Sequence, residues 1–262
     1  MSSPKSSERA PYVGQSLPRL NAERFVRGRG SYVADVHLPG EQHVAILRSP
    51  HPHARIRSID ASEARVLPGV EFVLTGEEVL RMTDPHGYLW RLDGQKDGQT
   101  RCLAYPIVRY VGEPVAAVVA ADLYTAEDAL ELIRVDYEIL PVLHTVEEAL
   151  APGALRLHEH WENNIVARSA WNVGDAAGAL AKADLVIKEQ FTIQRLMACP
   201  LEMRGVLASY DPAAPALTVW TSTQSIHQIR QGLSETLRIP EHRIRVLCPD
   251  VGGAFGSKAC LN

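Results

Sequence analysis

Paired cysteines are missing from this 262-residue sequence. Its four cysteines are far apart and form no C-x-x-C pair; they are Cys102, Cys199, Cys248 and Cys260. This spacing argues against a structural zinc site or an iron–sulfur cluster held by this chain. Unpaired thiols are normal in a reducing compartment, so we expect a cytoplasmic location.

Long apolar runs and blocks of basic charge are also missing. No stretch approaches the ~20 apolar residues needed to span a bilayer, and the Ser-rich start lacks the apolar core of a signal peptide. The net charge is only −4, with both signs scattered along the chain. No basic run could neutralise a series of phosphates. We therefore expect neither a transmembrane segment nor a nucleic-acid partner.

What is present is ordinary globular material, 46% hydrophobic and 22% charged. Residues 1–20 are polar and interrupted by proline and glycine, which predicts a flexible tail. Strands are then predicted at residues 45–47, 54–59, 70–74, 115–120 and 135–139, with short helices at 61–66 and 77–82.

One longer helix is predicted between the last two of these strands. Thr125 and Asp128 resemble a capping box at its start. Its apolar positions follow at helical spacing: Ala126, Ala129, Leu130 and Ile133. Strands mixed with helices predict one α+β domain over residues 21–146.

The second half begins with a connection, residues 147–164, that has few periodic features. In residues 165–262, Asp175 is predicted to cap a short Ala-rich helix. Alternation of Leu185, Ile187, Phe191 and Ile193 with polar residues predicts a strand. Strands at 217–221 and 243–247 flank a helix whose apolar stripe is Ile226, Ile229, Leu233 and Leu237 and which stops at Pro240.

A glycine-rich loop follows the last strand: Gly252, Gly253, Ala254, Phe255, Gly256, Ser257 and Lys258. Such glycines let the backbone turn sharply and bring N–H groups close to a ligand. Ser257 breaks the ending of a P-loop, and G-x-G-x-x-G does not fit the segment. By itself the loop is equally consistent with a plain tight turn, and an ordinary nucleotide-binding α/β protein stays a weaker alternative.

Six phrases in chain order carry a more specific resemblance. They are residues 27–35 (RGRGSYVAD), 47–56 (LRSPHPHARI), 111–120 (VGEPVAAVVA), 199–211 (CPLEMRGVLASYD), 220–224 (WTSTQ) and the glycine loop, 252–258. Together they resemble the large subunit of the xanthine dehydrogenase, aldehyde oxidase and aerobic carbon monoxide dehydrogenase family. The phrase at 199–202 favours the carbon monoxide dehydrogenase-like branch. Ala259 stands where xanthine-oxidising members have an acidic residue, which weakens purine hydroxylation.

The resemblance implies a hammerhead domain over residues 21–146 and the first part of a molybdopterin-binding domain over 165–262. It implies hydroxylation of a carbon centre (carbon monoxide, an aldehyde or an N-heterocycle) with oxygen derived from water. The implied cofactor is molybdenum-molybdopterin in its cytosine dinucleotide form. Electrons would leave through [2Fe-2S] and FAD subunits. The family's general-base glutamate is expected downstream, so this chain has no catalytic residue of its own and needs the remaining molybdopterin-domain segment as a partner.

The resemblance also implies site roles. Gln224 matches the family glutamine that donates a hydrogen bond to an oxygen ligand of molybdenum; the alternative is a cap for the helix that begins near Ser225. Gly252, Gly253, Ala254, Phe255 and Gly256 match the loop whose backbone approaches the pterin. Phe255 is equally well interpreted as a core aromatic. Ala254 replaces a frequent glycine and fits only if it avoids positive φ.

Other polar groups are interpreted as structural. His51 with His53, and His158 with His160, form H-x-H pairs without a third ligand, so structural or solvent-facing histidines are favoured. Cys260 is interpreted as a free thiol. Glu202 and Arg204 are interpreted as an ion pair, either buried or on the surface, with no catalytic role.

A second hypothesis stays open beside the enzyme. The sequence ends four residues after Lys258, which also suits a non-catalytic truncated remnant or an assembly module of the same fold.

Overall fold

The computed structural model of this chain describes residues 12–87, 92–98 and 100–259. The helices are α1 (Ala22–Val26), α2 (Ser62–Arg65), α3 (Gly76–Met82), α4 (Leu123–Glu131), α5 (Val146–Leu150), α6 (Ala176–Ala181) and α7 (Ile226–Leu237). The strands are β1 (His43–Arg48), β2 (Ala54–Asp60), β3 (Val70–Thr75), β4 (Ile107–Val108), β5 (Pro114–Ala120), β6 (Arg134–Ile139), β7 (Val206–Asp211), β8 (Ala216–Thr221) and β9 (Ile244–Leu247). Within the described ranges, no helix is long and apolar enough to cross a membrane. The α+β class predicted from the sequence is confirmed.

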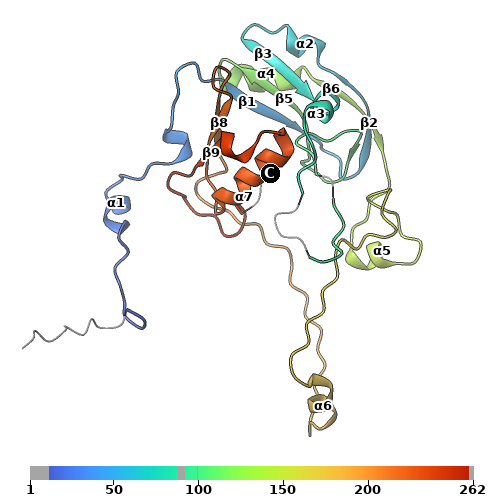
Figure 1. Ribbon diagram of the computed structural model, residues 1–262. Helices are drawn as coiled ribbons and strands as arrows, with labels where there is room; N and C mark the ends of the chain where they lie inside the picture. The colour runs from blue at the N-terminus through green and yellow to red at the C-terminus, as the bar shows by residue number, and fades with distance from the viewer. Residues whose placement is uncertain (1–11, 88–91, 99, 260–262) are drawn as a thin grey trace, which may run out of the picture.

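Two antiparallel sheets form the first half, with strand orders β1-β5-β3 and β4-β2-β6 (Figure 1). The central strand β5 is almost entirely buried, as its unbroken apolar run predicts. Helix α4 packs on this sheet through Ala126 and Ala129, which are fully buried in one cluster with Ala116 and Val118. Small residues at these positions let the helix backbone lie close to the strands.

The start of α4 differs from the predicted capping box. The cap is Asp122, whose carboxylate accepts a hydrogen bond from the Thr125 backbone N–H at 2.9 Å and from the Thr125 hydroxyl at 2.8 Å. An aspartate before the first turn satisfies N–H groups that have no partner within the helix. Thr125 is therefore the donor in this cap, and the helix begins at Leu123 instead of after Thr125.

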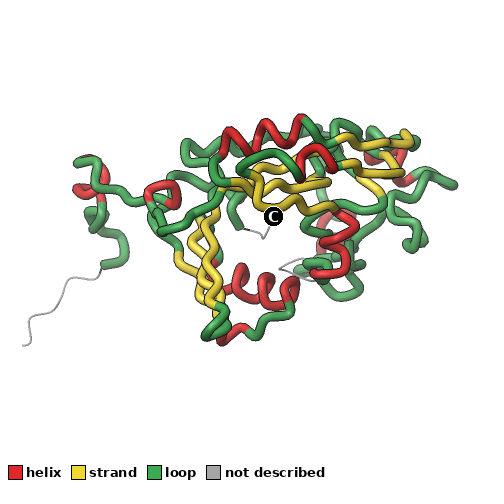
Figure 2. Tube along the Cα trace, turned by 90° about the horizontal axis from the view of Figure 1, so that it is seen from above, coloured by secondary structure: helices red, strands yellow, loops and turns green. Residues whose placement is uncertain are grey.

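The third sheet, in the order β7-β8-β9, positions the candidate site (Figure 2). Strands β7 and β8 are antiparallel, whereas β8 and β9 are parallel and are joined through α7. Leu217, Val219 and Ile244 form the core of this unit, against Leu233 and other apolar side chains of and around α7. Because β8 and β9 run in the same direction, the loops that leave them lie at one edge of the sheet, where α/β proteins usually bind ligands.

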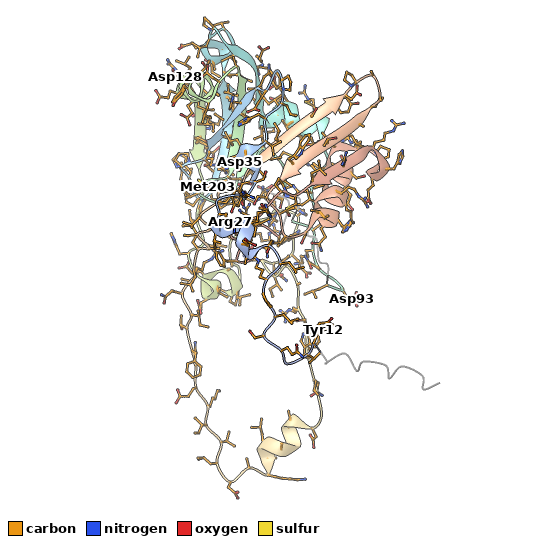
Figure 3. All side chains as sticks on the ribbon, turned by 90° about the vertical axis from the view of Figure 1, so that its left-hand side faces the viewer. Tyr12, Arg27, Asp35, Asp93, Asp128 and Met203 are labelled. Atoms are coloured by element: carbon orange, nitrogen blue, oxygen red, sulfur yellow. The ribbon has the colours of Figure 1, made fainter. Side chains whose placement is uncertain are left out.

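The segment between the two halves projects from the body of the molecule, with α6 at its far end (Figures 1 and 3). Asp175 caps α6 as predicted, since its carboxylate accepts from the Gly178 N–H at 2.9 Å. The strand predicted around residues 185–193 is wrong for this chain: the segment has no strand, and Leu185, Ile187, Phe191 and Ile193 are all highly exposed. An extended segment without a neighbouring strand cannot form the ladder that defines a sheet.

Two ion pairs connect segments distant in sequence. Arg238, just after α7, contacts Asp84 at 2.6 Å, and the Asp84 N–H donates to the Thr236 carbonyl at 2.9 Å. Arg24 contacts Asp250 at 2.5 Å, and Asp250 also accepts from the Ser31 N–H at 2.8 Å. The second contact attaches the N-terminal region to the start of the glycine loop.

Candidate cofactor site

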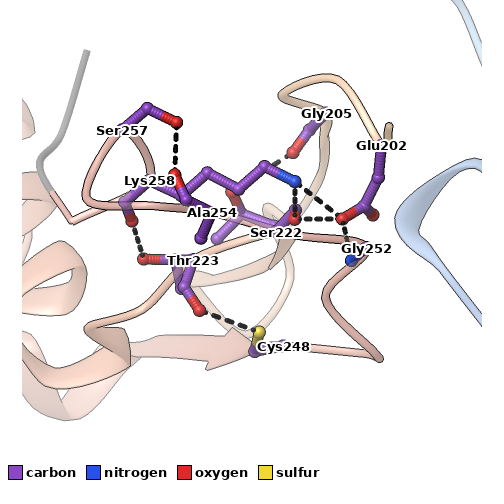
Figure 4. A network of polar contacts seen from close by, with 10 residues as sticks. Glu202, Gly205, Ser222, Thr223, Cys248, Gly252, Ala254, Ser257 and Lys258 are labelled. Carbon is purple, nitrogen blue, oxygen red and sulfur yellow. Dashed lines mark hydrogen bonds and ion pairs between the residues drawn. The ribbon is translucent and has the colours of Figure 1, made fainter. Parts of the chain in front are cut away.

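The two segments matched to cofactor binding meet at the carboxyl edge of β8 and β9 (Figure 4). The Lys258 carbonyl, at the end of the glycine loop, accepts from the Thr223 hydroxyl at 3.1 Å and from the Gln224 backbone N–H at 3.0 Å. The Cys248 thiol donates to the Thr223 carbonyl at 3.3 Å. Gln224 is therefore held against the loop through its backbone N–H and through its neighbour Thr223, and its own side chain takes no part in these bonds.

The glycine loop turns through three residues with positive φ: Gly253 (φ 96°), Phe255 (φ 49°) and Gly256 (φ 87°). Ala254 is not among them, which meets the condition that the sequence set for a methyl at this position. Its carbonyl accepts from the Ser257 N–H at 2.9 Å and from the Ser257 hydroxyl at 2.7 Å, closing the turn. The substitution of alanine for glycine thus leaves the loop geometry intact.

Gly252 is required for a different reason, a close approach of two segments. A Cβ at this position would lie 2.5 Å from the Glu202 Cβ. The Glu202 N–H donates to the Gly252 carbonyl at 3.1 Å, so the two backbones already touch. A side chain at 252 would force these segments apart.

Beneath the loop lies a polar cluster, which we call the Lys258 network: Glu202, Ser222, Gly252 and Lys258. The Lys258 ammonium is fully buried and contacts Glu202 Oε2 at 2.7 Å and Ser222 Oγ at 2.8 Å. The same Glu202 oxygen accepts from the Ser222 hydroxyl at 2.6 Å and from the Gly252 N–H at 2.8 Å. Burial alone would raise the pKa of Glu202, but these donors, with Lys258 the largest, outweigh it and lower that pKa.

This network corrects one sequence interpretation and shows a contact, Glu202 with Lys258, that the sequence did not predict. The ion-pair partner of Glu202 is Lys258, whereas Arg204 donates to the Ser257 carbonyl. A lysine next to a loop of small residues is ordinarily a solvated charge. Only the approach of the segment around Glu202 encloses it, and no spacing in the sequence indicates that approach.

Two side chains beside the Lys258 network are exposed, Gln224 and Phe255. Gln224 is exposed, and its amide makes no hydrogen bond to any part of the chain that the structure describes. It does not cap α7: the Ser225 N–H is taken by the Thr223 hydroxyl at 3.1 Å. Phe255 is 77% exposed, so the core-aromatic interpretation is wrong for this chain. Both side chains are free to contact a bound group.

The donor set fits an organic group that carries its metal on its own ligands. It offers a neutral amide and the backbone of a glycine loop, while the Glu202 carboxylate is neutralised by Lys258. Across residues 12–87, 92–98 and 100–259, no cluster of three or more His, Cys, Asp or Glu side chains is arranged to hold a metal ion.

The histidine pairs have structural contacts, as favoured from the sequence. His53 is buried and its Nδ1 lies 2.6 Å from the Pro141 carbonyl, and His51 packs edge-on against Tyr137. His158 stacks on Trp161 with ring centroids 4.2 Å apart, and desolvation lowers the pKa of His158 to about 4. The remaining sequence candidate, Cys260, lies outside the described residues.

Comparison with known protein families identifies the family of this chain. Residues 27–141 match the model "Aldehyde oxidase and xanthine dehydrogenase, a/b hammerhead domain", and residues 157–262 match "Molybdopterin cofactor-binding domain". The chain belongs to the xanthine dehydrogenase and aldehyde oxidase family. Both halves of the sequence-based resemblance are thereby confirmed, and the glycine loop lies within the molybdopterin-binding match.

Relatives in this family are similar over nearly the whole chain. The carbon monoxide dehydrogenase large chain of Afipia carboxidovorans is 40% identical over 97% of this chain and 33% of its own length. The xanthine dehydrogenase molybdenum-binding subunit of Escherichia coli is 34% identical, covering 92% of this chain and 32% of its own. The crystal structure of quinoline 2-oxidoreductase from Pseudomonas putida 86 superposes with a TM-score of 0.86 at 40% identity, over 95% of this chain and 32% of that one. The chain thus spans about a third of the length of these relatives.

Proposed function

We propose that this chain forms the hammerhead and one wall of the cofactor site in the large subunit of a molybdenum hydroxylase. The reaction would oxidise a carbon centre of a small molecule (carbon monoxide, an aldehyde or an N-heterocycle) with water-derived oxygen. The observation that carries this proposal is the exposed Gln224 amide, held beside the glycine loop by the Lys258 carbonyl.

Within this proposal, each part of the site has a role. The molybdenum-molybdopterin cofactor, in its cytosine dinucleotide form, would supply the redox chemistry. The backbone of residues 252–256 would bind it, and Gln224 would donate a hydrogen bond toward the metal end. A neutral amide suits that position because it orients a ligand without adding charge. The exposed Phe255 would exclude water by packing against the bound group.

One partner is indicated by an exposed apolar segment of this chain, and the others by the family. Leu185, Ile187, Phe191 and Ile193 are more than 70% exposed, although they alternate with polar residues as in a half-buried strand. We infer that a second polypeptide segment of the same domain, which also carries the general-base glutamate, covers them. Subunits with [2Fe-2S] clusters and FAD would accept the electrons, and the complex would be cytoplasmic.

The domain limits proposed for this assembly are those of the sequence pattern. Residues 1–20 form a tail, 21–146 the hammerhead domain, 147–164 a connection and 165–262 the first part of the molybdopterin-binding domain. Helix α5 lies across the proposed boundary between the hammerhead and the connection.

The test is to co-express this chain with the polypeptide that matches the remaining two-thirds of its relatives, together with their iron–sulfur and flavin subunits. We expect a complex with close to one molybdenum per large subunit, measured by elemental analysis. The Gln224 side chain is exposed and makes no hydrogen bond within the described residues, so the variant Gln224→Ala is expected to assemble equally well but to retain less molybdenum. A well-assembled complex without molybdenum would contradict the proposal and support a non-catalytic assembly module.

A further inference from the structure

The Lys258 side chain is charged and fully buried. Its ammonium and the backbone carbonyl of the same residue both make hydrogen bonds. Its ammonium contacts Glu202 and Ser222, while its carbonyl accepts from Thr223 and Gln224. One residue thus connects the segment before β7, the end of β8 and the glycine loop (Figure 4). Glu202 returns to the loop at its other end, through the Gly252 N–H.

We propose that Lys258 and Glu202 are positioning residues that set the Gln224 amide and the Gly252–Gly256 backbone in register for the cofactor. This inference rests on the proposed function. Neither residue touches the proposed binding surface, because Lys258 has a side-chain exposure of 0% and Glu202 of 15%. Lys258 contacts the Gln224 N–H through its backbone carbonyl, and Glu202 contacts the Gly252 N–H through its carboxylate.

Stability alone is a weak reason to bury this charge. Removing an ammonium and a carboxylate from water is costly, and well-packed apolar residues often stabilise a fold as well or better. Glu202 Oε1 is itself buried without a hydrogen-bond partner in the described part of the chain, so the pair is not optimised for stability. A charged pair does fix the geometry of its neighbours, because Lys258, Ser222 and Gly252 all donate to one carboxylate oxygen.

The first experiment measures cofactor retention in the co-expressed complex. The variants are Lys258→Met, which keeps the volume but removes the charge, and Glu202→Gln, which keeps the shape. The matched control is Val219→Ala, a buried core change in the same sheet that lowers stability without touching the network. We expect molybdenum per complex to fall about 10-fold in both network variants. This is the lower end of the loss in metal affinity seen when a group that orients a metal ligand is replaced. The control should keep wild-type loading at temperatures below its unfolding transition.

A second readout does not depend on the cofactor. In the 262-residue chain, hydrogen exchange of the Gly252 and Gln224 amides reports the bonds to Glu202 and Lys258. We expect faster exchange at both amides in Lys258→Met than in Val219→Ala at equal overall stability. Ser222→Ala, which removes one hydroxyl from the network, gives a milder change in the same direction and serves if Lys258→Met does not fold.

The two proposals fail in different ways. A wild-type complex without molybdenum refutes the proposed function, while the exchange experiment still tests the network. Wild-type loading and wild-type exchange in Lys258→Met and Glu202→Gln would overturn the positioning role. Equal loss of molybdenum in Val219→Ala and the network variants would overturn it too, because general destabilisation would then explain the effect.

Discussion

Gly252→Ala probes how tightly the glycine loop is packed against Glu202. The new Cβ would lie 2.5 Å from the Glu202 Cβ, about 1 Å inside ordinary carbon–carbon contact. Glu202 cannot easily move away, since Lys258, Ser222 and the Gly252 N–H all bond its Oε2. The change therefore overpacks a fixed site.

The expected loss follows from two opposing terms. Where φ is compatible, as it is at 252, replacing glycine by alanine stabilises a protein by roughly 0.4–1 kcal/mol through the unfolded chain. Overpacking costs about 1–3 kcal/mol. The midpoints of the two ranges leave a destabilisation of about 1.3 kcal/mol, and their extremes give about 0 and 2.6 kcal/mol. The loss rises to about 3–5 kcal/mol if Glu202 is driven from Lys258.

The assay is urea denaturation of the 262-residue chain followed by tryptophan fluorescence, to which Trp220 on β8 contributes. Gly205→Ala is the matched control, because its new Cβ would meet only the Val33 side chain, at 3.3 Å from Cγ1, and its φ is also compatible. We expect the control to stay within about 0.5 kcal/mol of wild type. A Gly252→Ala protein as stable as this control would refute the tight contact with Glu202.

Three further predictions concern the same region. Gly256→Ala has open space around its Cβ but a φ of 87°, so we expect a loss of about 1–2 kcal/mol from backbone strain alone, measured by the same denaturation. Phe255→Ala should leave the stability of the chain within about 0.5 kcal/mol of wild type, because the ring is exposed, yet should weaken molybdenum retention in the complex; a large stability loss would argue against the exposed ring. The Arg24 hydrogen bond lowers the pKa of Asp250 to about 2. That contribution is present above the unfolded pKa and is lost as the pH falls toward 2, so the stability advantage of wild type over Asp250→Asn, seen in thermal melts at pH 6, should vanish near pH 2.

Helices and strands were predictable where the periodicity and the composition of a short segment determine them. The run of valine and alanine in β5, the stripe of α7 and the cap of α6 by Asp175 each depend on neighbours within a few residues. The cap of α4 was missed by three residues, because Asp122 and Thr125 are both good capping residues and only the backbone geometry selects between them. The strand around residues 185–193 failed for a different reason. Alternation shows that one face seeks burial, but pairing requires a neighbouring strand, which the described chain does not provide.

The candidate site likewise has features that the sequence predicted and features that only the structure shows. Gln224 and the glycines could be proposed from the sequence because each belongs to a short phrase that resembles the family. Whether Ala254 avoids positive φ, and whether Phe255 is buried, depended on the path of the loop.

By itself, the sequence determined the family and the α+β class, and it named the residues proposed to form the edge of the site. The tertiary structure decided how that edge is held. Lys258 and Glu202 are 56 residues apart, and they pair only because parallel β8 and β9 bring the loop over the segment that precedes β7. Burial of a charge is a property of what surrounds it in space, which local sequence does not encode.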